Sequence, residues 1–392
     1  MSLKSMVTGR DVEVLEFSEH VAEPDAPVDI QIPVNNGPIS GIALSRDGRR
    51  LLVTNYGSDS VSIIDTSSFR VVDAVDGVDE PFSIALGGDD RAYVSTVSAS
   101  YDAIQVIDLT TNTVVGTHPL ALSVSDLTVS ADGKRVYATR SGIRGADVAI
   151  LDTETERVEV VEIANTSGVT TECVRVSPDG SRLYVGVNAP SGGQLVVIDT
   201  GVATDEAETV ARARWRRKTT RSKNAKQAGK SGPTVIATIE IGLALRDVAI
   251  SPNGGLVYAA SSGPEFSVID VVDTRTNKIA GTRKIAEVSG LLTRLTLSGD
   301  GERAYLVSDD SVTMLCTLTQ DVIDSVNVAT QPSCVVESPN GKYLYIADYS
   351  GTVTVAPIAA GDESGVEQTA LESKRSVDLF VPELLQYDAA LV

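Results

Sequence analysis

Side chains that commonly carry out chemistry are sparse in this chain of 392 residues. The two histidines, His20 and His118, and the three cysteines are too scattered for a zinc site or a disulfide framework. Cys173 and Cys334 lie within apolar runs, which favours core packing over a reactive thiol. The sequence lacks a nucleophile elbow, a P-loop and a glycine-rich dinucleotide loop. We therefore predict neither a cofactor nor a metal ion.

The densest cluster of charge is a basic segment at residues 212–230, which holds nine Lys and Arg and no acidic residue. The whole chain has 33 basic and 53 acidic residues and a net charge of −20. An acidic body repels nucleic acid and anionic membranes, whereas this segment attracts acidic surfaces. The candidate partner-binding residues in the segment are Arg212, Arg214, Trp215, Arg216, Arg217, Lys218, Arg221 and Lys223.

The elements that position these residues belong to an internal repeat. Each copy has an alternating apolar run, the turn signal Ser-x-Asp/Asn-Gly, and a second alternating run. Alternation with period two indicates strands, and the turn signal indicates a tight hairpin. Six full copies and one shortened copy begin at Gly41, Ser83, Asp126, Cys173, Asp247, Arg294 and Cys334. An in-register stripe of mostly tyrosines in the second run predicts shared core packing.

A second motif, of which residues 60–66 (SVSIIDT) are typical, follows the hairpin in five copies. It predicts a second hairpin, whose Asp and Thr side chains cap the turn through hydrogen bonds to the backbone. Four strands at a period of about 44 residues correspond to one propeller blade. Seven copies predict an all-β fold, a seven-bladed β-propeller of four-stranded antiparallel blades.

The seventh copy has only three strands, so we expect its outer strand to come from the N-terminal run at residues 26–34. The expected organisation is an N-terminal extension at 1–25, a propeller at 26–360 and a C-terminal tail at 361–392. The basic segment lies within an insertion at 203–233, between the third and fourth strands of the fourth blade. The tail either packs on the body or docks a partner.

In a propeller, the residues that begin the innermost strands meet at one mouth of the axial channel. The charged residues at these positions are Asp126, Glu172, Arg246, Asp247 and Arg294. They are candidate ligands for a polar small molecule, and carboxylates beside arginines are expected to have shifted pKa values. The alternative is that they pair with one another and with channel water, as the polar lining of a narrow pore. The set lacks a nucleophile with its base, so it predicts no mechanism of hydrolysis.

The repeats resemble the YVTN family of bacterial seven-bladed propellers. The resemblance rests on LLVTNYGSDSVSIIDTSSFRVV at residues 51–72 and VIDLTTNTVVGT at residues 106–117, and it covers about residues 26–360. Such propellers serve as lactonase-like enzymes, surface proteins and scaffolds, so the resemblance is specific for fold rather than function. The chain is also similar to cytoplasmic propellers of actinobacteria such as mycobacteria. That similarity implies an accessory role beside cell-envelope lipid transport machinery.

The N-terminus lacks the apolar region of a secretory signal, and no stretch approaches the roughly 18 apolar residues that span a bilayer. We therefore expect a cytoplasmic protein, peripheral to the inner membrane. The favoured function is a non-enzymatic interaction scaffold with a membrane-associated protein partner. The basic segment also suits an anionic lipid surface, whereas nucleic acid is disfavoured by the acidic body. The alternative is a lactonase-like hydrolase or a small-ligand binder at the channel mouth.

Overall fold

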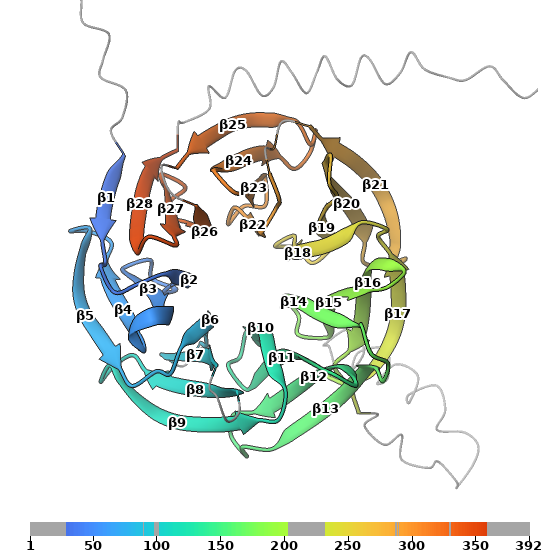
Figure 1. Ribbon diagram of the computed structural model, residues 1–392, viewed down its shortest axis with the longest axis horizontal. Helices are drawn as coiled ribbons and strands as arrows, with labels where there is room; N and C mark the ends of the chain where they lie inside the picture. Colours follow the sequence, from blue (N-terminus) through green and yellow to red (C-terminus); the bar gives the residue numbers. More distant parts are fainter. Residues whose placement is uncertain are drawn as a thin grey trace, which may run out of the picture.

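The computed structural model describes residues 29–358 except 89, 98–101, 203–231, 287, 289 and 329–330. In this part of the chain, the strands form seven four-stranded antiparallel sheets around a central axis (Figure 1). The only helix described is a short 3₁₀ turn at Tyr56–Ser58. The predicted all-β, seven-bladed β-propeller is confirmed.

Within each blade, the strands are given from the innermost, at the channel, to the outermost. Blade 1 consists of β2 (Ile39–Leu44), β3 (Arg50–Asn55), β4 (Ser60–Asp65) and β5 (Arg70–Asp76). Blade 2 consists of β6 (Pro81–Leu86), β7 (Arg91–Thr96), β8 (Asp102–Asp108) and β9 (Thr113–Leu120). Blade 3 consists of β10 (Ser123–Val129), β11 (Arg135–Gly142), β12 (Gly145–Asp152) and β13 (Val158–Ala164). Blade 4 consists of β14 (Thr170–Val176), β15 (Arg182–Ala189), β16 (Gly192–Asp199) and β17 (Thr234–Glu240).

The remaining three blades follow the same plan. Blade 5 consists of β18 (Ala244–Ile250), β19 (Leu256–Ser262), β20 (Ser267–Asp273) and β21 (Lys278–Ile285). Blade 6 consists of β22 (Arg294–Leu297), β23 (Arg303–Val307), β24 (Ser311–Cys316) and β25 (Val322–Asn327). Blade 7 consists of β26 (Pro332–Glu337), β27 (Tyr343–Asp348), β28 (Thr352–Pro357) and, from the N-terminus, β1 (Ile30–Pro33).

The repeated Ser-x-Asp/Asn-Gly signal builds the turn between the first two strands of a blade. In blade 1, Ser45 Oγ donates a hydrogen bond to Asp47 Oδ1 at 2.7 Å and accepts one from the Arg50 amide at 2.9 Å. Gly48 has a φ of 70°, a conformation that a residue with a Cβ adopts only at a cost. The Ser, Asp and Gly of the signal therefore each have a defined role in the turn.

The Asp-Thr motif caps the second hairpin, as predicted. Thr66 Oγ1 donates to the Gly48 carbonyl at 2.6 Å, while Asp65 Oδ1 accepts from the Ser68 amide at 2.8 Å. The equivalent threonines that bond to a turn glycine are Thr153, Thr200 and Thr274. Hydrogen bonds from the hydroxyl groups of Ser67 and Ser68 lower the pKa of Asp65 from 3.8 to about 2.

This lowered pKa predicts a loss of stability in acid. Because the pKa of Asp65 is lower in the folded state, its contribution is present above pH 3.8 and disappears as the pH falls toward about 2. We expect the stability difference between the wild type and Asp65→Asn to shrink over this range, because the variant has no charge to lose. Urea unfolding at several pH values measures it, and parallel pH profiles would contradict the assignment.

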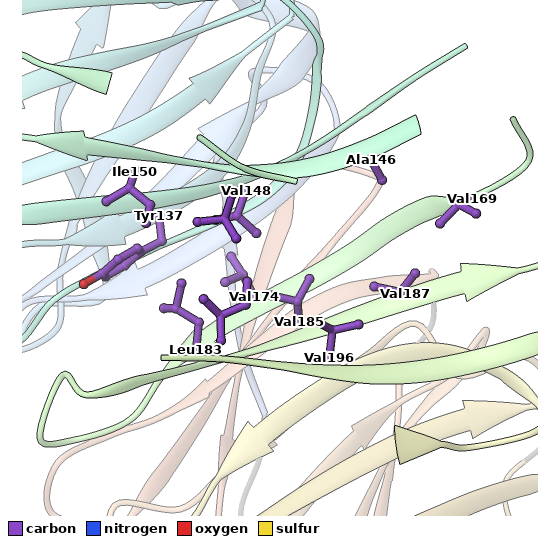
Figure 2. Packing of buried hydrophobic residues seen from close by; sticks show 12 residues of the cluster. Tyr137, Ala146, Val148, Ile150, Val169, Val174, Leu183, Val185, Val187 and Val196 are labelled. Atoms are coloured by element: carbon purple, nitrogen blue, oxygen red, sulfur yellow. The ribbon is translucent and has the colours of Figure 1, made fainter. Parts of the chain in front are cut away.

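The hydrophobic core lies between neighbouring blades rather than within one sheet. Figure 2 shows Tyr137 and Val148 of blade 3 beside Val174 and Leu183 of blade 4, which belong to one buried cluster. The predicted tyrosine stripe is part of this core: the buried residues of the stripe are Leu52, Tyr93, Tyr137, Tyr184, Tyr258, Tyr305 and Tyr345. A blade therefore completes its core only when both neighbours are present.

The ring is closed by pairing the two ends of the folded chain. β1 lies antiparallel to β28, with Ile32 opposite Val353, so blade 7 takes its outer strand from the N-terminus (Figure 1). Ile32 and Val34 are buried in the cluster that joins blades 7 and 1. The predicted closure by residues 26–34 is thus confirmed for its described part.

Candidate functional site

A register shift near the start of the innermost strand organises the channel mouth. It occurs in β2, β6, β10, β14, β18 and β26, where the first strand carries an extra residue relative to the second. A bulge of this kind re-aims neighbouring side chains. Consecutive residues at the start of a blade therefore line different levels of the channel.

The upper level is a mouth cavity of about 580 Å³, and the lower level is an inner cavity of about 230 Å³. The mouth cavity is lined by the bulge residues Ser40, Phe82, Ser125, Glu172, Arg246 and Ser333 and, in blade 6, by Thr293, which precedes β22. The inner cavity is lined at the next positions by Gly41, Ser83, Asp126, Asp247, Arg294 and Cys334. Arg294 also lines the mouth, so its side chain connects the two levels.

The two aspartates of the inner cavity share one arginine. Arg175 Nη1 lies 2.5 Å from Asp126 Oδ2, and Nη2 lies 2.8 Å from Asp247 Oδ1. The carboxylates also accept the backbone amides of Val174 at 3.2 Å and Leu295 at 3.0 Å, each in the next blade. This network links blades 3, 4, 5 and 6 around the channel.

The charges in this network stabilise one another. Burial acts to raise the pKa of Asp126, but the guanidinium groups of Arg175 and Arg294 outweigh it, and the pKa lies below its usual value. Burial likewise acts to lower the pKa of Arg175, but Asp247 and Asp126 raise it above its usual range. Asp126 and Asp247 both form ion pairs with Arg175, so these two residues follow the pairing alternative.

Arg175 is the residue that the sequence analysis missed. It lies in β14, two residues beyond Cys173, and its side chain reaches the inner cavity. The residues at this position in the other blades are Ala43, Ala85, Thr128, Ala249, Thr296 and Val336. Arg175 is the one charged residue at this position of the repeat, where the other blades have small or apolar residues. This difference was the signal in the sequence that could have identified it.

The remaining charged residues do not pair with one another. Among the described residues, neither Arg246 nor Arg294 makes a hydrogen bond or an ion pair through its side chain, and Arg246 Nε is buried without an acceptor. Glu172 Oε1 instead accepts a hydrogen bond from Thr170 Oγ1 at 2.9 Å. A buried donor without an acceptor costs about 1–3 kcal/mol. At the upper level, the described charged residues therefore do not pair with one another, and only their pairing with channel water stays a prediction.

Other candidate groups lie in structural positions. Cys173 and Cys334 are buried, and burial raises the pKa of both thiols, to about 11 for Cys334, which favours the unreactive thiol form. Within the described ranges, no three His, Cys, Asp or Glu residues are grouped to hold a metal ion. His118 is in the outer strand β9, away from the channel, and His20 lies outside the described residues.

The candidate residues of the basic segment also lie outside the described residues. These are Arg212, Arg214, Trp215, Arg216, Arg217, Lys218, Arg221 and Lys223. The residues around the insertion are described: Asp199 of β16 is directly opposite Thr234 of β17. The hydrogen bond from Thr200 Oγ1 to the Gly180 carbonyl, 2.6 Å long, places this end of β16 beside the β14–β15 turn, on the face opposite the mouth.

The sequence aligns along nearly all its length with a known propeller. It is 55% identical over 386 residues to the seven-bladed beta-propeller protein Rv1057 of Mycobacterium tuberculosis, and the alignment covers 97% of this chain and 96% of that protein. The chain belongs to this seven-bladed β-propeller family. No family model matches the chain, so membership of the YVTN family stays a prediction.

A solved structure has the same architecture as this propeller. Hydrazine synthase of Kuenenia stuttgartiensis superposes with a TM-score of 0.66 at 19% sequence identity, covering 83% of this chain and 96% of that chain. A similarity at this level of identity shows the fold alone. In the described part of the propeller, no helix has the length and apolar character needed to cross a bilayer.

Proposed function

We propose that this propeller is a non-enzymatic interaction scaffold, cytoplasmic and peripheral to the inner membrane, that assists a membrane-associated cell-envelope lipid transport complex. One observation carries the proposal. The β16–β17 ladder continues to Asp199 and Thr234, which are paired, although the chain between them contains the insertion. The described residues on either side of the insertion thus form a complete pair of strands.

Charge indicates the kind of partner. The insertion carries nine basic residues at 212–230 on a chain whose net charge is −20. Basic side chains on an acidic body favour a partner with an acidic patch, and Arg-rich segments form charge-assisted hydrogen bonds with carboxylates. We assign the partner as a protein. Contact with anionic lipid is an alternative outcome of the experiment below.

The alternative function is a hydrolase or a small-ligand binder at the channel. Ser83 Oγ donates to Asp126 Oδ1 at 2.8 Å, which is the geometry of a nucleophile beside a base. However, Asp126 is also bonded to Arg175, and its lowered pKa makes it a weak base. Small-ligand binding is favoured by the unpartnered arginines of the mouth, Arg246 and Arg294.

The scaffold role predicts that the basic charges are needed to retain a partner. We expect affinity purification from cells to recover a protein partner with the full chain and to lose it, by about tenfold or more, when all nine Lys and Arg at 212–230 are replaced by Gln. A mouth variant, Arg246→Gln, serves as the matched control. A variant of Asp247 is unsuitable as a control, because the Asp247 carboxylate is buried and paired with Arg175.

Two results would count against this function. Retention of the partner by the Gln-substituted chain would exclude the basic segment as the contact. Binding of that segment to vesicles containing anionic lipid, without recovery of any protein, would assign the contact to the membrane surface instead.

A further inference from the structure

We propose that the axial mouth binds a small molecule through its carboxylate or phosphate group, held by the guanidinium groups of Arg246 and Arg294. This site is at the opposite end of the blades from Asp199 and Thr234, the paired residues on either side of the insertion. Ligand binding at the mouth therefore goes beyond the scaffold role, and an experiment can contradict either proposal without affecting the other.

Arg246 presents an unused guanidinium to the mouth. It is the bulge residue of β18, where the register shifts between Leu245 and Asp247, so its side chain leaves the ladder and lines the cavity. Its Nε has neither solvent nor an acceptor, and Glu172, in the neighbouring blade, does not form an ion pair with it. An arginine whose guanidinium group lacks acceptors gains hydrogen bonds when an oxyanion binds to that group.

Arg294 supplies the second positive group from the next blade. It begins β22 and lines both the mouth and the inner cavity. Asp126 and Asp247 raise the pKa of Arg294 against the opposing effect of burial, yet neither forms an ion pair with it. Their oxygens are occupied by Arg175, by Ser83 and by backbone amides. The Arg294 guanidinium is therefore charged and available.

The rest of the mouth limits the kind of ligand. A cavity of about 580 Å³ is the size of a metabolite site, and the residues that line it include Tyr56, Ser125, Thr171 and Tyr349, whose side chains are polar. Asp102 and Glu172 add negative charge to the same wall. This combination favours a molecule with a single oxyanionic group and a polar remainder, and it disfavours a polyanion.

Titration of the purified full-length protein tests the site. Inorganic phosphate and lactate are used separately in isothermal titration calorimetry, with ionic strength held constant by sodium chloride. We expect saturable binding of at least one probe, and the probe that binds distinguishes a phosphate from a carboxylate ligand. Arg246→Gln and Arg294→Gln should each weaken that binding by roughly tenfold or more.

The matched control is Arg144→Gln, which removes the same charge from the exposed turn between β11 and β12, outside the mouth cavity. It should bind as the wild type does. Without a probe, Arg246→Gln should unfold at the same or a higher urea concentration, because the substitution removes a buried donor that has no acceptor. A purely structural role for Arg246 predicts the opposite.

Three results would overturn the proposal: no saturable binding of either probe to the wild type, wild-type affinity in folded Arg246→Gln, or an equal loss of affinity in Arg144→Gln. The last result would show that only net charge matters. If Arg294→Gln does not fold, the comparison of Arg246→Gln with Arg144→Gln decides alone.

Discussion

Replacing Arg175 with methionine is expected to lower the free energy of unfolding by about 3–5 kcal/mol, because two buried carboxylates lose their shared counter-charge. Asp126 is 3% exposed and Asp247 is 1% exposed, so water cannot replace the lost guanidinium. The closest comparison is Arg283, whose ion pair with Asp321 also joins two blades but is more exposed. Arg283→Met is expected to cost at most about 1 kcal/mol. Urea unfolding of both variants measures the difference.

The loss of folding stability in Arg175→Met should depend on pH. Without the guanidinium, burial raises the pKa of the two carboxyl groups in the folded state above their unfolded values. A carboxyl group whose pKa is raised in the folded state stabilises the protein only at low pH, and this contribution is lost as the pH rises. The stability lost in Arg175→Met should therefore be smallest near pH 4 and largest near pH 7. Adding Asp126→Asn and Asp247→Asn should recover much of the loss. A deficit that is independent of pH would assign the effect to lost packing instead.

Ile32→Asp is expected to open the ring. Ile32 is 3% exposed in the cluster between blades 7 and 1, and a carboxylate there is buried without a partner, at a cost of about 3–5 kcal/mol. Ile30 in the same strand is 42% exposed, so Ile30→Asp should change stability by about 0.5 kcal/mol or less. Urea unfolding of the two variants measures the difference.

A displaced β1 would leave β28 as an unpaired edge, so Ile32→Asp should also self-associate. Size-exclusion chromatography with light scattering detects this, with Ile30→Asp as the control. A monomeric Ile32→Asp chain of wild-type stability would show that β1 does not hold the ring closed.

The fold was predictable because the residues that specify its turns are close together in the sequence and recur from repeat to repeat. The bond from Ser45 to Asp47 and the positive φ of Gly48 are confined to one turn, and the same residues recur in phase along the chain. Closure was predictable for a different reason: a three-stranded last blade requires a fourth strand, and the N-terminal run containing Ile32 supplied one. Both inferences need only periodicity and strand counting.

The candidate site was predictable in its members but not in its pairing. The repeat brought Asp126, Glu172, Arg246, Asp247 and Arg294 to the channel, where the structure places them. It could not show that a bulge separates Arg246 from its neighbour Asp247 into two levels. Nor did it identify Arg175, because the register of three blades decides which carboxylates this side chain reaches. Such contacts depend on the relative placement of blades, which no single repeat encodes.

The pairing of β1 with β28 also has a consequence for biosynthesis. Roughly 320 residues separate Ile32 from Val353, so β1 leaves the ribosome long before its partner is made. At about 5–20 residues per second, the first strand waits on the order of 15–60 s while the intervening blades form on the nascent chain. A prematurely terminated product that lacks β28 keeps an open ring and an exposed strand, the features that proteases and chaperones recognise. Closure by the N-terminal strand thus marks a chain whose translation has reached the last blade.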